Sequence, residues 1–459
     1  MTNVVIIGGG PGGYEAALVA SQLGAEVTLI ERDGIGGAAV LTDVVPSKAL
    51  IAVAEAAIDT KGSSTIGVHA TDVTIDIADV NARLKKWAAT QSSDIKQRLL
   101  SQGVKVLAGT AELIDAENVK AKLNDGSEVT LKAEVVLLAT GARPRELASA
   151  IIDGERILNW KQLYDFTELP TDLIVVGSGV TGAEFAGAYQ ALGSQVTLVS
   201  SRDQVLPGED SEAAKVVQDV FAKRGMKVLS QTRAVQVTRN ESGVSVELSS
   251  GKVITGSHCL MAVGSLPNTE NIGLAQVGVS TNEGGFIEVD KVSRTSVRGV
   301  YAAGDCTGVL MLASVAAMQG RIAMWHALGD SVHPLNLETV SSNVFTDPEI
   351  ATVGVSQADV DSGKETANVL NLPLATNARA KMQGISEGFV KIFCRPDTGV
   401  IVGGVVVAPK ASELIFSIAL AVEHRLTVDQ MSQTITVYPS LSGSIAEAAR
   451  QLHQTQNLN

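Results

Sequence analysis

An apolar, β-branched run at residues 4–7 opens the chain and predicts a buried β-strand. A glycine-rich turn follows at residues 8–13, and residues 14–23 then carry apolar side chains at helical spacing until Gly24. Residues 27–31 form a second apolar run that ends in Glu31. Strand, turn, helix and strand in this order are typical of one β-α-β unit in a parallel sheet.

The same pattern recurs in the middle of the chain. Residues 173–176 are strand-like, residues 177–182 are glycine-rich, a helical stretch runs to Gly193, and residues 196–199 are strand-like again. The same number of positions separates Gly8 from Glu31 and Gly177 from Ser200. Because this repeat is far too long for a solenoid, it indicates two dinucleotide-binding units in one chain.

The remaining pattern completes an α/β fold. We predict a long helix over residues 74–100, short strands within 104–131, and buried strands at 135–141, 259–264 and 299–305. After Pro334 the pattern changes to strands at 388–394 and 400–407 and helices at 412–422 and 442–451. The predicted architecture is two Rossmann-type dinucleotide-binding domains, residues 1–149 with 270–338 and residues 150–269, plus a C-terminal α+β domain at 339–459.

Composition and charge exclude several classes of function. Of the 459 residues, 45% are hydrophobic and 19% are charged, which suits several buried cores. A net charge of −13 argues against binding to nucleic acid or to anionic lipid. The apolar runs stop short of the ~18 residues of a spanning helix, and no leader pattern opens the chain. We therefore expect a cytoplasmic protein without an integral membrane segment.

The chain contains three cysteines, Cys259, Cys306 and Cys394. They are far apart, odd in number and in no CxxC pair, which excludes a disulfide framework and a cysteine-rich zinc site. We expect no metal centre and a reducing compartment.

The two glycine-rich turns are the first candidate binding sites. Each has the GxGxxG pattern, formed by Gly8, Gly10 and Gly13 and again by Gly177, Gly179 and Gly182. With 44 glycines in 459 residues, chance alone gives roughly 0.4 bare matches. Two matches, each between a strand and a helix, instead indicate turns that bring backbone and a helix N-terminus against a pyrophosphate.

The residue at the end of the second strand differs between the two units. Glu31 stands where a carboxylate accepts hydrogen bonds from a ribose 2′-hydroxyl. Ser200 stands at the matching position, and Arg202 follows it, so nothing there repels a 2′-phosphate and Arg202 can pair with one. We predict that the second site accepts NADPH, and NADH remains open. The alternative is that Arg202 is an ordinary surface charge.

Further motifs extend over nearly the whole chain. In order they are GGGPGG at 8–13, GGAAVLTDVVPSK at 36–48, ATGARP at 139–144, GSGVTGAE at 177–184, GSLPN at 264–268, YAAGDC at 301–306, VFTDPEIATVG at 344–354 and YPSLSG at 438–443. This order resembles the flavoprotein disulfide reductases, the family of lipoamide dehydrogenase, glutathione reductase and mercuric reductase. The resemblance implies FAD in the first site, NAD(P)H in the second, and a homodimer formed through the C-terminal domain.

The resemblance also implies individual roles. Besides the three glycines of the first turn and Glu31, the residues it assigns to FAD are Ala111, Gly141, Asp305 and Ala313. Gly264 belongs with the nicotinamide nucleotide, together with the second glycine turn, Ser200 and Arg202. Lys48 matches the lysine near flavin N5, and Glu184 matches its carboxylate partner. A cation there stabilises a reduced anionic flavin, and a carboxylate keeps the buried lysine charged.

The sequence departs from the family at its redox centre. Ala39 and Val44 occupy the two places of the redox-active Cys-x4-Cys pair. Tyr438 stands in place of the histidine that protonates the leaving thiol, and Gly443 in place of its glutamate. Because neither Ala nor Val can form a thiolate, and the histidine–glutamate pair is missing too, we do not expect disulfide reduction.

What remains is a flavin that must pass its electrons directly to an acceptor. Quinones are flat, accept two electrons, and suit an apolar wall at Ala39 and Val44. The sequence therefore predicts an NAD(P)H:quinone oxidoreductase, in which Tyr438 of the partner subunit donates a hydrogen bond or proton to the quinone. A transhydrogenase or diaphorase, and a degenerate binding subunit, remain alternatives.

Overall fold

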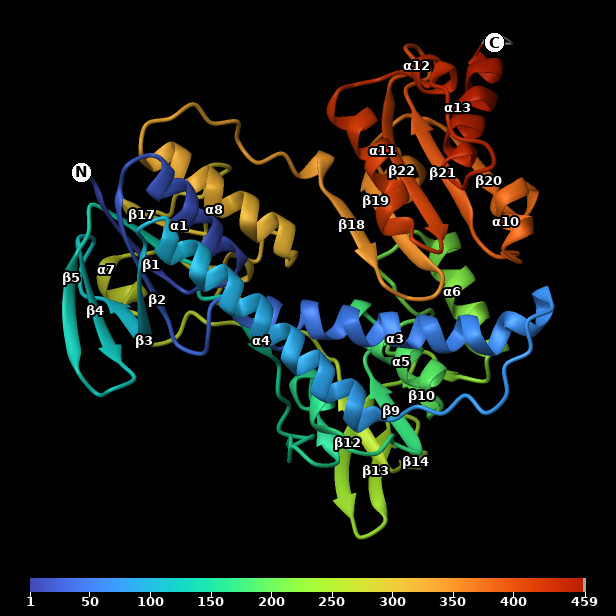
Figure 1. Ribbon diagram of the computed structural model, residues 1–459, viewed down its shortest axis with the longest axis horizontal. Coiled ribbons are helices and arrows are strands. Elements are labelled where there is room, and N and C mark those ends of the chain that lie inside the picture. Colours follow the sequence, from blue (N-terminus) through green and yellow to red (C-terminus); the bar gives the residue numbers. More distant parts are fainter. Residues whose placement is uncertain (457–459) are drawn as a thin grey trace.

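The largest sheet of the protein has seven strands and lies at the left of Figure 1. The computed structural model describes the backbone of residues 1–456 and the side chains of residues 1–453. The sheet order is β17-β6-β1-β2-β3-β4-β5, in which the first five strands pair in parallel and the last two are antiparallel. The strands are β1 (Asn3–Ile7), β2 (Glu26–Glu31), β3 (Lys105–Leu113), β4 (Asn118–Leu123), β5 (Glu128–Lys132), β6 (Val135–Leu138) and β17 (Val300–Ala302). Helices α1 (Pro11–Gln22) and α8 (Ala313–Ala327) pack against each other and against this sheet.

A second parallel sheet repeats the arrangement, in the order β11-β10-β9-β15-β8. Its strands are β8 (Ile157–Leu158), β9 (Asp172–Val176), β10 (Gln195–Val199), β11 (Lys227–Leu229) and β15 (His258–Met261), with helices α5 (Val180–Leu192) and α6 (Ser211–Lys223). The register repeats too, since Val4 pairs with Val27 in the first sheet and Leu173 with Val196 in the second. The predicted pair of β-α-β units is therefore confirmed.

Two small sheets accompany the parallel ones. An antiparallel sheet is formed by β12 (Ala234–Asn240), β13 (Gly243–Leu248) and β14 (Val253–Gly256). A two-stranded ribbon pairs β7 (Ala142–Pro144) with β16 (Ser265–Pro267). Because β7 follows β6 and β16 follows β15, this ribbon ties the carboxyl ends of the two parallel sheets together.

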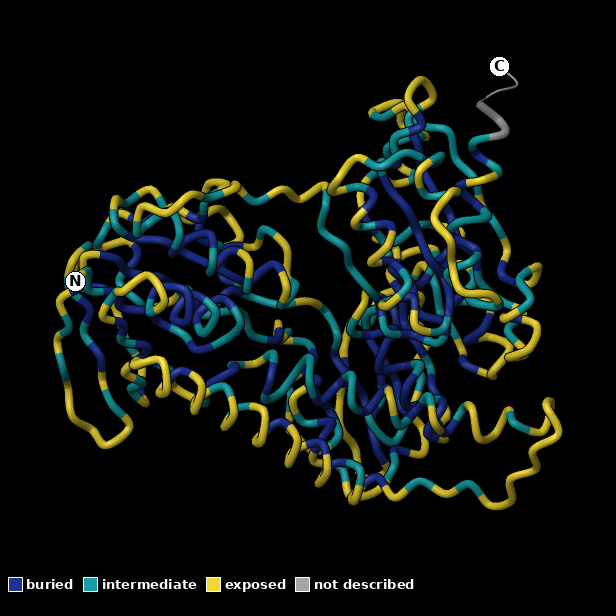
Figure 2. Tube along the Cα trace, turned by 45° about the horizontal axis from the view of Figure 1, so that its top comes forward, coloured by how far each residue is buried: buried dark blue, intermediate teal, exposed yellow. Residues whose placement is uncertain are grey.

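The C-terminal part contains a five-stranded antiparallel sheet in the order β18-β19-β22-β21-β20. Its strands are β18 (Ser341–Val344), β19 (Glu349–Gly354), β20 (Asn368–Pro373), β21 (Phe389–Cys394) and β22 (Ile401–Ala408), and helices α11 (Ala411–Glu423) and α13 (Gly443–Gln456) pack against it. The α+β pattern predicted after Pro334 is confirmed. Figure 2 shows buried residues in the interior of the molecule and exposed ones along its outer edge.

Two long helices cross the middle of the molecule, α3 (Val44–Gly62) and α4 (Ile77–Ser101) (Figure 1). The predicted helix over residues 74–100 corresponds to α4. Helix α3 packs against α4 and α5, and one hydrophobic cluster joins its Leu50 to Phe185 of α5 and Phe389 of β21. The shorter helical segments are α2 (Gly37–Leu41), η1 (Ser63–Ile66), η2 (Trp160–Asp165), α7 (Leu274–Val277), η3 (Asp305–Thr307), η4 (Leu337–Thr339), α9 (Gln357–Asp361), η5 (Leu374–Thr376), α10 (Ala378–Met382) and α12 (Val428–Gln433).

One expectation about apolar length was wrong. The helical stretch Gly37–Ile66 has the length and mean hydropathy, 1.5, of a membrane span. It includes α3, whose buried Leu50 and Ala54 contribute to the cluster shared with α4, α5 and the C-terminal sheet. A third of its most apolar window is buried within the protein.

Candidate cofactor and active site

In the first glycine turn, one position leaves room for a ligand, and two others have no room even for a Cβ atom. Gly8 has a φ of +106°, and a Cβ there would lie 2.2 Å from the carbonyl oxygen of Ala139. A Cβ on Gly13 would lie 1.8 Å from the carbonyl oxygen of Gly8. A Cβ on Gly10 would meet no protein atom within 4 Å. The outer glycines therefore permit close backbone packing, and Gly10 keeps a cradle open at the start of α1, where no side chain caps the helix.

The second turn has the same geometry. A Cβ on Gly177, where φ is +113°, would lie 2.1 Å from the carbonyl oxygen of Ala262. A Cβ on Gly182 would lie 1.9 Å from the carbonyl oxygen of Gly177, and Gly179 faces open space. Helix α5 begins there without a side-chain cap. Both turns thus fit the pyrophosphate of a dinucleotide. A tight turn that binds no ligand would not need an open position at its middle glycine.

A cavity of about 420 Å³ lies in front of the first turn. The predicted residues that line it are Gly8, Gly10, Glu31, Gly141, Asp305 and Ala313. Gly13 lies behind the turn against Gly8. Ala111 is outside the lining, on the part of β3 that pairs with β4, where Ala111 is opposite Ala121. The structure therefore brings most of the predicted FAD residues to one cavity.

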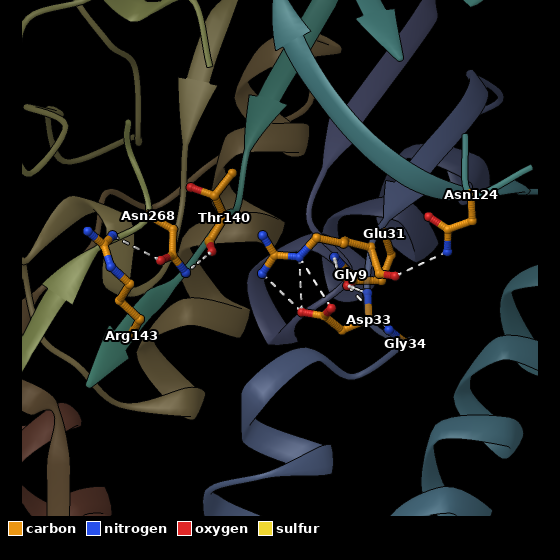
Figure 3. A network of polar contacts seen from close by, with 9 residues as sticks. Gly9, Glu31, Asp33, Gly34, Asn124, Thr140, Arg143 and Asn268 are labelled. Atoms are coloured by element: carbon orange, nitrogen blue, oxygen red, sulfur yellow. Dashed lines mark hydrogen bonds and ion pairs between the residues drawn. The ribbon is translucent and has the colours of Figure 1, made fainter. Parts of the chain in front are cut away.

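The carboxylate of Glu31 is held by backbone amides at the end of β2 (Figure 3). Its Oε2 accepts a hydrogen bond from the N–H of Gly9 at 2.6 Å, and its Oε1 accepts from the N–H of Asp33 at 2.7 Å. Oε1 also accepts from the N–H of Gly34 at 3.3 Å, whereas Oε2 has a second lone pair that no backbone group uses. Glu31 can therefore order the turn and still accept a hydrogen bond from a ribose hydroxyl.

A second network in Figure 3 was not predicted from the sequence. Asn268 donates from Nδ2 to the carbonyl oxygen of Thr140 at 3.0 Å, and Arg143 donates to the carbonyl oxygen of Pro267 at 2.9 Å. Asn268 and Thr140 both line the cavity. These bonds fix the β7–β16 ribbon at the cavity wall, and the GSLPN and ATGARP motifs were the signal for them.

Lys48 and Glu184 form an ion pair with an Nζ–Oε2 distance of 2.7 Å. Glu184 is on α5 and its side chain is 4% exposed, whereas that of Lys48, on α3, is 27% exposed. Oε1 of Glu184 accepts from the N–H of Phe345 at 2.8 Å, and the Lys48 amine lies 5.0 Å from the Phe345 ring centroid. The predicted pairing of these two residues is therefore present, and the amine has a fixed position one helical turn beyond Val44.

Ala39 and Val44 both line the cavity, so an apolar wall occupies the place of the family's cysteines. Cys259 and Cys306 are completely buried, and burial raises the pKa of their thiols to about 12 and about 11 respectively. The Sγ of Cys306 donates to the carbonyl oxygens of Leu138 and Ala303. Both thiols therefore stay protonated inside the core, and neither replaces the missing pair.

Two carboxyl groups at the cavity have perturbed pKa values. Burial, and to a lesser extent the charge of Asp43, raises the pKa of Asp305 to about 6. Burial likewise raises the pKa of Asp43, against the opposing effect of Lys48. Sequence reasoning missed Asp43, although an acid in the apolar run before Pro46 was a signal for it.

The second nucleotide site has Ser200 and Arg202 at the end of β10. Ser200 is completely buried, and its hydroxyl is hydrogen-bonded to that of Ser178 at 2.7 Å and accepts from the N–H of Arg202 at 3.1 Å. Ser200 thus shapes the loop instead of facing a ligand. Arg202 is exposed, and Gly264, with a φ of +96°, ends the stretch after β15.

Tyr438 lies far along the chain, between α12 and α13, with a relative exposure of 85%. Ile435 and Val437 beside it are 98% and 77% exposed. Tyr438 is not among the residues that line the cavity of its own chain. Any contact it makes with a cofactor site must involve a second subunit.

This combination of two glycine cradles, a buried Lys–Glu pair and a C-terminal antiparallel domain defines a family. Residues 2–320 match the model of the pyridine nucleotide-disulphide oxidoreductases, and residues 340–449 match the dimerisation domain of the same family. The chain belongs to this family. Its cofactors are accordingly FAD and NAD(P)H, and residues 340–449 are its dimerisation domain.

Individual relatives extend this result. The chain is 55% identical to an NAD(P)H dehydrogenase (quinone) of Mycobacterium tuberculosis, over all of this chain and 95% of the relative. It is 33% identical to a dihydrolipoyl dehydrogenase of Zymomonas mobilis, over 97% of each chain. The crystal structure of LpdA from M. tuberculosis superposes with a TM-score of 0.95 at 55% identity, covering 98% of this chain and 100% of that one.

Proposed function

We propose that the protein is an NAD(P)H:quinone oxidoreductase that works as a homodimer. The nicotinamide nucleotide gives a hydride to FAD, and the electrons pass from there directly to a quinone. The quinone is proposed by extension from the M. tuberculosis relative, whose name includes it. A location in the cytoplasm remains a prediction.

The observation that carries this proposal is the cavity wall at Ala39 and Val44. A disulfide reductase needs a sulfur pair at these positions, yet the Lys48–Glu184 ion pair one turn further along α3 is intact. A lysine ammonium next to a flavin favours its reduced, anionic form. The chain therefore keeps the residues that support flavin reduction and lacks those that pass electrons to a disulfide.

The residues proposed to hold FAD fit it. Gly10 leaves the backbone of the α1 N-terminus open to the pyrophosphate, and Glu31 keeps a lone pair on Oε2 for the ribose. Asp305 at the cavity wall is proposed to accept a hydrogen bond from a ribityl hydroxyl. Gly141 and Ala313 are part of the same wall. When bound, FAD would supply two-electron chemistry, in which a hydride is taken from NAD(P)H and passed to a quinone.

The nucleotide is proposed to bind at the second glycine turn, which is expected to accept NADPH. Arg202 supplies the positive charge, since it is exposed and follows the loop that Ser200 fixes. An aspartate or glutamate at position 200 would repel the 2′-phosphate by about 4 kcal/mol at ~4 Å and an effective dielectric of ~20. Ser200 avoids that repulsion.

Tyr438 is proposed to donate a hydrogen bond to the quinone bound to the partner subunit. Its exposure and its position in the dimerisation domain are compatible with this role. Quinone turnover by Tyr438→Phe tests it, because an unchanged rate removes the phenol from the reaction.

The function as a whole is tested by rapid mixing of the FAD-containing protein. Anaerobic NADPH should bleach the flavin, and a naphthoquinone should then reoxidise it much faster than NAD⁺ does. Faster reoxidation by NAD⁺ would favour a transhydrogenase, and a protein that NADPH does not bleach would be a binding subunit.

A further inference from the structure

Asp43 is the N-cap residue of α3, but its side chain does not cap the helix. The side chains of Asp76 and Asp210, at the same position of α4 and α6, accept hydrogen bonds from backbone N–H groups of the first turn. Among the described residues, no partner hydrogen-bonded to the Asp43 carboxyl is found. An aspartate at an N-cap normally stabilises its helix through that bond. Asp43 does not make this hydrogen bond.

The side chain instead lies, partly exposed, at the cavity wall. Asp43 lines the cavity directly beside Val44, in the segment that also contributes Ala39. A carboxyl that is shielded from water and has no hydrogen bond favours its neutral form, and desolvation is the main reason that the pKa of Asp43 is raised. Such a carboxyl binds its proton more tightly than an ordinary aspartate does.

The charged and titratable groups that face Asp43 come from four elements. They are Lys48 on α3, Glu184 on α5, Lys161 and Tyr164 on η2, and Asp305 on η3. The two lysines favour the carboxylate, and the two acids favour the protonated form. Lys48 is already neutralised by Glu184 at 2.7 Å, so its effect on Asp43 is weakened. The environment as a whole therefore raises the pKa of Asp43 above that of an ordinary aspartate, so that its proton is held until a base arrives.

The reaction needs such a proton. Reduction of a quinone to a hydroquinone takes two electrons and two protons. A hydride brings both electrons and one proton, so the second proton must reach the quinone oxygen from an acid. The histidine that serves this purpose for a thiol is replaced by Tyr438, whose phenol can donate a hydrogen bond.

We propose that Asp43 is a catalytic residue that gives this second proton to a quinone bound against Ala39 and Val44. The inference rests on the proposed quinone reductase function and adds to it the side of the cavity on which the acceptor binds. The O–H bond of Asp43 breaks as the O–H bond of the hydroquinone forms. The carboxylate then regains a proton from water before the next turnover. Tyr438 is left with the role of a hydrogen-bond donor.

The test compares two electron acceptors on the FAD-loaded Asp43→Asn variant. Asparagine keeps the shape of the side chain and cannot deliver the proton. After anaerobic reduction by NADPH, reoxidation by menadione should be about 10²-fold slower than in the unmodified protein, the size of a lost general acid. Reoxidation by ferricyanide, which takes single electrons and no proton, should change less than about twofold. Asp76→Asn, an aspartate at an exposed N-cap outside the cavity, is the matched control and should change neither rate.

Two further readouts do not depend on turnover by one variant. The menadione rate of the unmodified protein should fall as pH rises through the raised pKa of Asp43, and that of Asp43→Asn should not. The midpoint potential of the bound FAD should be the same in both proteins at acid pH. At alkaline pH it should be higher in Asp43→Asn, because the variant then lacks a carboxylate beside the flavin.

The outcomes separate this inference from the proposed function. A menadione rate in Asp43→Asn within twofold of the original overturns the role of Asp43 and leaves the quinone reductase intact. An equal loss with both acceptors also overturns it, since that indicates a change in the flavin and not in proton delivery. If the unmodified protein is reoxidised by ferricyanide and not by menadione, the proposed function itself fails.

Discussion

Lys48 and Glu184 are 136 positions apart in the sequence, and their side chains meet with an Nζ–Oε2 distance of 2.7 Å. The contact exists because α3 packs directly on α5. Glu184 also accepts a hydrogen bond from the backbone of Phe345, so the pair joins three parts of the chain. It positions one cation beside the wall formed by Ala39 and Val44.

Replacement of Glu184 by Gln tests this pair. Because Glu184 is buried and Lys48 partly exposed, the free energy of unfolding should fall by about 1–3 kcal/mol. Flavin reduction by NADPH should be roughly tenfold slower, since the amine loses its fixed position. Thermal unfolding and stopped-flow absorbance measure the two effects. Asp219→Asn, which breaks the exposed pair with Lys215, should cost less than about 0.5 kcal/mol and leave reduction unchanged.

Alanine at two glycines of the first turn should separate ligand binding from folding. Gly10→Ala has space in the protein and an extended backbone, so its stability should change by less than about 1 kcal/mol. FAD affinity should fall about 10- to 100-fold, because the new methyl group enters the cradle. Gly13→Ala should lose folding stability instead, since its Cβ overlaps the Gly8 carbonyl. Flavin content and thermal unfolding of both variants measure this. Normal FAD affinity in Gly10→Ala would contradict the assignment.

The choice of nucleotide should depend on Arg202. Loss of a charged hydrogen bond to a 2′-phosphate costs about 1.5–3 kcal/mol, so Arg202→Ala should lower the ratio of kcat/KM for NADPH over NADH roughly 10- to 100-fold. Lys252→Ala removes an exposed charge on the same domain and should leave the ratio unchanged. An unaltered ratio in Arg202→Ala would make this residue an ordinary surface charge.

FAD binding should depend on pH through Asp305. In the apoprotein, burial and the charge of Asp43 raise the pKa of Asp305 to about 6. The neutral form of Asp305 therefore adds to the free energy of unfolding at low pH, and this contribution is lost as pH rises through 6. A ribityl hydroxyl that donates to the carboxylate favours the ionised form. FAD affinity should therefore increase as pH rises from below to above 6, and calorimetry should detect proton release. An Asp305→Asn variant should show much less of this dependence.

The sequence predicted the fold where local pattern and tertiary structure agree. The glycine turns, the strands beside them and α4 follow from apolar spacing and from turns that only glycine can form. Helix α3 was not predicted, because it is apolar on several sides and lacks the one-sided pattern of a surface helix. Its contacts with α4 and α5 come from distant parts of the chain, which local pattern does not contain.

The site was predictable to a similar extent. Motifs located Glu31, Lys48, Glu184 and Asp305, because each follows a strand end or lies in a distinctive segment. The burial of Ser200 and the uncapped carboxyl of Asp43 depend on where neighbouring loops fold. Neither could be derived from residue type and spacing alone.

The central claim is that electrons pass from the flavin to the acceptor without storage on sulfur. Anaerobic titration with dithionite tests this most directly, because a flavin alone takes two electrons and a flavin with a redox-active disulfide takes four. We predict complete bleaching after two electrons per FAD, without a long-wavelength thiolate-to-flavin band at any stage. Consumption of four electrons per FAD, or appearance of that band, would contradict the account.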